Sequence, residues 1–297
     1  MPRTRTGLRF GGTWTEDKLA RVRRYLDQYM VIFRKHPNLI PIYVDAFAGT
    51  GYREPATDAC AAQLPIAELD TEGRAFLKGS ARIALEVDPP FGRYLFVEAN
   101  PSHAAALEEL KREFTHLNNR MEIVPGDANA YLQKWCSTTD WRDHRAVVFL
   151  DPCGTQVEWS TVRCLAETES VDLWYLFPLS AVTRLMPRAG KPPAGWVERL
   201  NHIYGTDSWQ SEFYPDKPTT TLFGDIQTGY READLDAIMQ FTLGRLRSVF
   251  PAVAPNPLVL RNDRNNSPLF LLCFAAASRK ESTQQAALRI ASHILKM

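Results

Sequence analysis

The stretch Ile42–Gly51, IYVDAFAGTG, decides the fold expected for this chain. An apolar run ends at Asp45, and Gly49 and Gly51 follow in a turn. Glycine lets the backbone approach a ligand closely, and the carboxyl ends of the strands are the usual ligand site in open α/β sheets. The stretch therefore predicts a buried strand that leads into a binding loop.

Four further apolar runs follow, with segments of helical character between them. The runs are YLFVE at 94–98, MEIVP at 121–125, RAVVFL at 145–150 and VDLWYLF at 171–177. Near the end of the chain, residues 256–260 and 267–276 flank the turn-forming RNDRNN and predict an antiparallel hairpin. Strands that are apolar on both faces, alternating with helices, predict an α/β fold with a Rossmann-like, mostly parallel sheet and a mainly helical insertion.

The pattern suggests four parts along the chain. They are a basic N-terminal segment with a helix (1–40), a Rossmann-like cofactor-binding core (41–179), a helical insertion or subdomain (180–255), and a closing hairpin with a final helix (256–297).

Composition narrows the class of protein. The 297 residues, 45% of them hydrophobic, are enough for a sizeable core. No apolar run reaches the roughly 20 residues that span a bilayer, and no secretory signal is recognisable, so we expect a cytoplasmic protein. Five cysteines without CxxC or His-linked spacing predict reduced thiols and no metal site. The net charge of +1 gives no global attraction for nucleic acid.

Two further acids end predicted strands. Glu98, followed by Ala99, can accept both hydroxyls of a ribose, although alone it could simply cap the next helix. Asp127, followed by Ala128, ends the third strand. Because successive strands bring these acids to one edge, the sequence predicts a nucleoside-type cofactor, and the missing third glycine of G-x-G-x-x-G disfavours NAD.

The glycine loop resembles motif I of methyltransferases, in the D-x-F-x-G-x-G form of nucleic-acid amino-methyltransferases. The resemblance implies a class I fold that binds S-adenosyl-L-methionine and releases S-adenosyl-L-homocysteine. The cofactor-binding residues that it implies are Asp45, Phe47, Gly49, Gly51, Glu98, Ala99, Asp127, Ala128 and Asp151.

Asp151 and Pro152 follow the fourth strand, where such enzymes carry D/N-P-P-Y/F, and they are the expected catalytic residues. An acid at this point can orient an amine and accept its hydrogen bond, which leaves the nitrogen lone pair aimed at the methyl group. Cys153 and Gly154 replace the second proline and the aromatic residue, so a flipped adenine base loses support as the acceptor.

Nearly the whole chain resembles the three-Cys-motif partner family, TcmP. The matching segments are Trp14-Thr15-x-x-Lys18, the loop at 45–51, Gly79-Ser80, Phe96-Val97-Glu98, Gly126-Asp127-Ala128-Asn129, Phe149-Leu150-Asp151-Pro152-x-Gly154, Val171-Asp172-Leu173, Phe177-Pro178 and Pro268-Leu269-Phe270. The family usually has Phe at the position of Cys153. The resemblance implies a methyltransferase that works with a three-cysteine, radical-enzyme-like protein, and it brings no assigned substrate.

Several alternatives stay open. The acceptor could be an amino group of a nucleic-acid base, a small molecule or a peptide. A non-catalytic scaffold that binds the cofactor is the main alternative function, and a metal-dependent hydrolase or nuclease is a third. Thr15 and Lys18 are expected at the start of a surface helix, with a contribution to the cofactor pocket as the second interpretation.

Overall fold

The computed structural model describes residues 13–47, 79–152, 154–215, 218–221, 224–227, 230–263 and 265–297. Gly49, Gly51 and Cys153 lie outside these ranges, as does the expected basic segment at 1–12. Within the described part, no helix combines the length and the apolar character that crossing a membrane requires.

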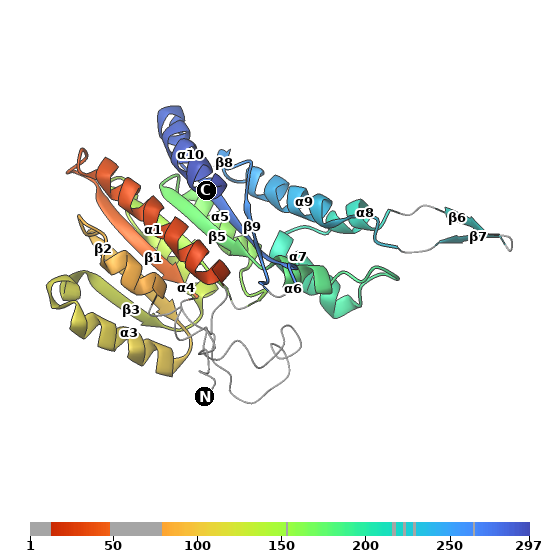
Figure 1. Ribbon diagram of the computed structural model, residues 1–297, viewed down its shortest axis with the longest axis horizontal. Helices are drawn as coiled ribbons and strands as arrows, with labels where there is room; N and C mark the ends of the chain where they lie inside the picture. The colour runs from red at the N-terminus through yellow and green to blue at the C-terminus, as the bar shows by residue number, and fades with distance from the viewer. Residues whose placement is uncertain are drawn as a thin grey trace, which may run out of the picture.

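Five parallel strands form one side of an eight-stranded sheet (Figure 1). They are β1 (Ile40–Ala46), β2 (Arg93–Glu98), β3 (Met121–Pro125), β4 (His144–Leu150) and β5 (Val171–Phe177). Their order is β3-β2-β1-β4-β5, so the chain moves outward from β1 and then returns to place β4 on its other side. Ligands of doubly wound sheets bind at the carboxyl edge of such a switch point.

Antiparallel strands close the sheet beside β5. Strand β10 (Pro268–Ala276) pairs with β5, and both β8 (Ala252–Val253) and β9 (Leu258–Arg261) pair with β10. The predicted hairpin and the α/β, mostly parallel fold class are confirmed. Strand β8 was not predicted, because two residues carry no readable periodicity.

Helices cover both faces of the sheet and enclose two cores. The first face, called the α1 face, is covered by α1 (Thr13–Phe33), a helix at 79–85, α3 (Pro101–Glu113) and α10 (Glu281–Lys296). A 3₁₀ turn, η1 (Thr115–Arg120), leads from α3 to β3. The second face, called the α5 face, is covered by α4 (Ala128–Thr138), α5 (Trp159–Glu167), α6 (Leu179–Arg184), α7 (Ala194–Tyr204), α8 (Trp209–Phe213) and α9 (Leu235–Arg247).

Alternate residues of each strand belong to the two cores. On β1, Tyr43 packs in the core of the α1 face and Val44 in that of the α5 face; on β4, Phe149 and Val148 do the same. This alternation explains why the strands read as continuous apolar runs in the sequence. It also determines which face each acid at a strand end points to.

A separate two-stranded hairpin interrupts the helices of residues 179–247. It consists of β6 (Pro218–Thr221) and β7 (Gly224–Gln227), between α8 and α9 (Figure 1). The sequence predicted a mainly helical segment and missed this hairpin. Strands of four residues are too short to show an alternating pattern.

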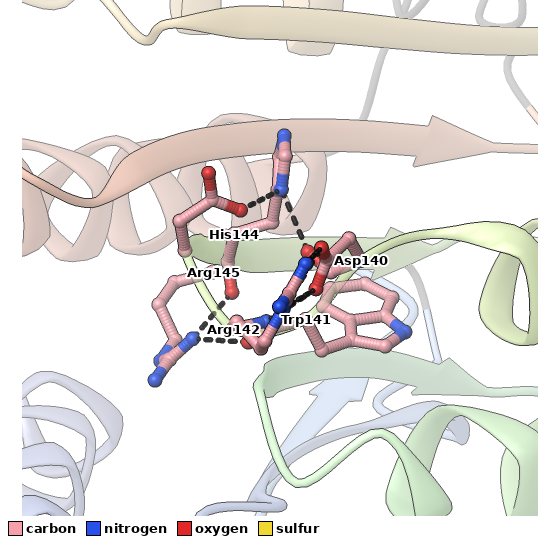
Figure 2. A network of polar contacts seen from close by, with 6 residues as sticks. Asp140, Trp141, Arg142, His144 and Arg145 are labelled. Carbon is pink, nitrogen blue, oxygen red and sulfur yellow. Dashed lines mark hydrogen bonds and ion pairs between the residues drawn. The ribbon is translucent and has the colours of Figure 1, made fainter.

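The loop that enters β4 is held by a polar network at the amino end of the strand (Figure 2). Arg142 donates to both carboxylate oxygens of Asp140 and lowers its pKa to about 2. His144 Nδ1 lies 2.8 Å from the Asp140 carbonyl oxygen, and Arg145 donates to the His144 carbonyl at 2.6 Å. These groups fix the entry to β4, at the opposite end of the strand from Asp151.

Candidate functional site

The ends of β1, β2 and β4 carry three acids that share one face of the sheet. Strand β1 pairs in register with β2 and β4 up to its last residue, Ala46. Ala46 pairs with the residue just before Glu98 on β2 and with the residue just before Asp151 on β4. Asp45 comes directly before Ala46 on β1. Because side chains alternate along a strand, all three point to the α1 face. With strands about 4.8 Å apart, Glu98 and Asp151 flank the end of β1 at a spacing of about 10 Å.

Asp45 is completely buried at the end of β1. Its Oδ2 accepts a hydrogen bond from the Tyr43 hydroxyl at 3.3 Å, whereas its Oδ1 has no hydrogen-bond partner among the described residues. Burial raises the pKa of Asp45 to about 7, the nearby Asp151 raises it, and the Ser80 hydroxyl and Lys18 lower it. A buried carboxylate with an unsatisfied oxygen is costly unless it serves a ligand.

Replacing Asp45 with asparagine is expected to stabilise the fold at about pH 8 and to change little near pH 4. The folded-state pKa of about 7 lies above the usual value of 3.8, so this group's contribution to stability is complete below about 3.8 and is lost as the pH rises through about 7. Asparagine stays neutral throughout, which predicts a gain of roughly 2 to 4 kcal/mol at high pH. Urea unfolding of the wild-type and Asp45→Asn proteins between about pH 4 and pH 8 measures the difference in the free energy of unfolding. A gain in stability that does not depend on pH would contradict the prediction.

Asp151 forms a buried ion pair with Lys18 of α1. Lys18 Nζ lies 3.4 Å from both carboxylate oxygens, and the exposed fractions of the two side chains are 3% and 10%. Burial raises the pKa of Asp151, and Lys18 opposes that shift. The expectation that Lys18 lies on the surface was therefore wrong, because this turn of α1 packs onto the end of β4; the side chain of Thr15 lies outside the described residues.

Replacing Lys18 with methionine is expected to lower the free energy of unfolding by about 3 to 5 kcal/mol, because it leaves the buried Asp151 carboxylate without its cation. The double variant Lys18→Met/Asp151→Asn should recover part of the loss. Lys35→Met, at an exposed position after α1, changes the net charge equally and serves as the control in urea unfolding. Equal losses for the two single lysine variants would refute a stabilising ion pair.

Glu98 is buried at the end of β2 and keeps one oxygen unsatisfied. Its Oε1 accepts the Asn100 backbone N–H at 2.7 Å and lies 3.6 Å from His103 Nδ1, whereas Oε2 is buried without a hydrogen bond to any described residue. Burial raises the pKa of Glu98 to about 7, and the backbone N–H groups of Asn100 and Ala99 lower it. Asn100, rather than Glu98, caps α3, by accepting from Ser102 N at 2.9 Å.

Asp127 lies at the same edge but not in the buried group. It is exposed, and its Oδ1 accepts the Ala130 N–H at 2.7 Å as the N-cap of α4, while Ala128 is buried. Gly126 N donates to the Glu98 carbonyl at 3.0 Å, which ties the turn after β3 to the end of β2. Asp127 is therefore near Glu98 along the edge, with one oxygen already used for the helix.

Phe47 has a left-handed backbone, with a φ of 66°. Non-glycine residues rarely adopt this conformation, and it concentrates at functional turns. Continued alternation would point Phe47 to the α1 face, but its side chain packs in the core of the α5 face. The turn thus removes the ring from the face that carries Asp45, Glu98 and Asp151.

The loop after Asp151 is held by Asn129, which sequence analysis did not assign to the site. Asn129 Nδ2 donates to the Gln156 carbonyl at 2.9 Å, and its Oδ1 accepts from Glu158 N at 3.0 Å and Thr161 Oγ1 at 2.9 Å. These bonds tie the start of α4 to the segment after Asp151, where Pro152 is buried and Gly154 has a φ of 89°. The one sequence signal for this contact was the asparagine that ends GDAN.

Metal ligands do not converge in the described ranges, where no group of three or more His, Cys, Asp or Glu side chains is arranged to hold an ion.

No known protein-family model matches the chain, and no curated protein matches its sequence. Among solved structures, it is similar in fold to protein LPL1258 of the DUF519 family from Legionella pneumophila, with 14% identity, a TM-score of 0.48, and coverage of 96% of this chain and 92% of that one. Spermidine synthase from Thermotoga maritima gives 12% identity, a TM-score of 0.40 and 89% coverage of this chain, which spans 59% of that protein's length. The N-terminal domain of EvdMO1, crystallised in the presence of S-adenosylhomocysteine and D-fucose, gives 9% identity, a TM-score of 0.34, and coverage of 85% and 82%. Likenesses this distant concern the fold alone.

Proposed function

We propose that this protein is an S-adenosylmethionine-dependent methyltransferase. The observation that carries the proposal is a group of three acids on one face at the switch point of a doubly wound sheet: Asp45 and Glu98, which are buried, and Asp151, whose side chain is 10% exposed. Asp45 and Glu98 each keep one buried carboxylate oxygen that has no hydrogen bond to any described residue. Unsatisfied buried acceptors of this kind suit the hydroxyl and ammonium donors of a bound nucleoside with an amino-acid tail.

Each acid has a distinct role in the proposal. Glu98 accepts the ribose hydroxyls, and the negative charge of Asp45, at the end of β1, favours the cationic end of the cofactor. Asp127 and the backbone at Ala128 lie toward the base. When bound, S-adenosylmethionine would supply a sulfonium methyl group: the nitrogen–carbon bond would form as the sulfur–carbon bond breaks, S-adenosylhomocysteine would leave, and the methylated nitrogen would lose its proton to solvent.

Asp151 orients the acceptor in this proposal. As a carboxylate it accepts a hydrogen bond from the acceptor amine, which fixes the direction of the nitrogen lone pair. Lys18 favours the ionised form of the Asp151 carboxylate, against the rise in its pKa that burial causes, and the Asn129 contacts hold the segment after Asp151 in place. Pro152 restricts the backbone next to Asp151.

Calorimetric titration of the full chain with S-adenosylhomocysteine tests the cofactor site. We expect binding to S-adenosylhomocysteine and much weaker binding to ATP and NAD. Absence of binding to S-adenosylhomocysteine would refute the proposal.

The acceptor and the partner are proposed on sequence resemblance. The acceptor is an amino group on a nucleic-acid base, or alternatively a small molecule or peptide, and the partner is a three-Cys-motif, radical-enzyme-like protein as the likeness to the TcmP family implies. Co-expression with such a protein, followed by size-exclusion chromatography, tests the partner; separate elution of the two would argue against a stable complex.

A further inference from the structure

Two large aromatic side chains are exposed beside α6 and α7. In the described part of the chain, the exposed large apolar residues are Val31, Trp196, Tyr230 and Met297, and the two aromatics of this set both lie here. Trp196 has 41% of its surface exposed and Tyr230 has 56%. We define the Trp196 surface as Arg184, Arg188, Lys191, Trp196, Arg199 and Tyr230.

Backbone contacts hold Tyr230 beside the segment that follows α6. Tyr230 forms an antiparallel bridge with Ala189, and Arg231 N donates to the Arg188 carbonyl at 3.0 Å. The Arg231 guanidinium donates to the Met186 carbonyl, also at 3.0 Å. Tyr230 is thereby fixed next to the segment that carries Arg188 and Lys191, rather than on an independent loop.

The surface carries more cations than acids. Arg184, Arg188 and Arg199 are exposed and form no ion pair with any described residue. Burial lowers the pKa of the neighbouring Arg231, and Arg188 lowers it further by like-charge repulsion, while Tyr214 opposes this shift. The acids close by in sequence are Glu198 and Glu232. Uncompensated cations at this density favour an anionic partner.

The chain reaches the Trp196 surface from the carboxyl edge of the sheet, through α6 on the α5 face. Helix α6 starts at Leu179, directly after β5 ends, and packs against β10 (Figure 1). Strand β5 is the neighbour of β4, which leads into Asp151. On α7, Trp196 and Arg199 are three residues apart and so share one side of the helix.

We propose that the Trp196 surface binds a single-stranded nucleic acid as the substrate of the methyltransferase. This inference rests on the proposed methyltransferase function and names its substrate class. Arginine and lysine side chains neutralise phosphates, and the exposed aromatic rings stack on unpaired bases, which a duplex does not offer. An acidic peptide would satisfy the cations but would leave the aromatic rings without a role.

Fluorescence anisotropy with a labelled single-stranded RNA and the matching duplex tests the proposal on the full chain. We expect the single strand to bind more tightly than the duplex. Trp196→Ala/Tyr230→Ala should weaken single-strand binding by about tenfold or more, because each stacked base contributes substantially to affinity. Arg188→Ala/Arg199→Ala should make the slope of log Kd against log salt shallower by about 1.4. Arg112→Ala, at an exposed position on α3, should change binding little.

Calorimetry with S-adenosylhomocysteine on the same variants separates failure of this inference from failure of the proposed function. Retained cofactor binding with lost RNA binding in the aromatic variant supports the inference. It is overturned if the wild-type protein binds the cofactor but not RNA, if the duplex binds equally well, if polyglutamate competes as well as RNA, or if Arg112→Ala loses as much affinity as the arginine pair. RNA binding without any cofactor binding would instead remove the methyltransferase function.

Discussion

Replacing Asp151 with asparagine is expected to reduce methyl transfer by about 100-fold or more while leaving the affinity for S-adenosylhomocysteine nearly unchanged. The carboxylate is proposed to orient the acceptor amine, and an amide offers a weaker, uncharged acceptor. Cofactor binding, which is proposed to depend on Glu98 and the glycine loop, should persist. Incorporation of labelled methyl groups into fractionated cell extract measures the first effect, and calorimetry measures the second.

Asp236→Asn, at an exposed position in the first turn of α9, is the matched control and should be fully active. Equal incorporation by the Asp151→Asn and wild-type proteins would remove Asp151 from the mechanism. No incorporation by the wild-type protein, despite cofactor binding, would favour the non-catalytic scaffold.

Replacing Glu98 with glutamine is expected to weaken binding of S-adenosylhomocysteine by about 10- to 100-fold. The carboxylate can accept from two ribose hydroxyls, whereas the amide offers one acceptor oxygen, and hydrogen bonds to a charged group are the stronger ones. Because burial raises the pKa of Glu98 to about 7, wild-type affinity should also decline as the pH falls through that value. Calorimetry over this pH range measures both effects.

Glu109→Gln, on the exposed side of α3, should bind the cofactor as the wild-type protein does. An unchanged affinity in Glu98→Gln, together with cofactor binding by the wild-type protein, would place the ribose elsewhere on the edge. A decline with pH that persists in Glu98→Gln would assign the titration to another group, such as Asp45, whose pKa burial also raises to about 7.

Much of the fold was readable from the sequence because its signals are local. Apolar runs such as 146–150 are buried on both faces, and the acids at 45 and 98 lie within one residue of the end of their strands. In a parallel sheet all strands end at one edge, so counting along the chain was enough to bring these acids together. The cap at Asp127 shows the limit of that reasoning, because a strand-end acid can be used by the following helix instead.

The sequence by itself determined the doubly wound sheet, its closing hairpin and the acids at its carboxyl edge, since each follows from periodicity over a few residues. The tertiary structure alone decided which groups those acids meet. Lys18 reaches Asp151 across 133 residues, Asn129 reaches Thr161 across 32, and the bridge between Ala189 and Tyr230 completes the Trp196 surface. Such contacts depend on how helices pack onto the sheet. The spacing of residues within one segment does not indicate which other element will pack against that segment.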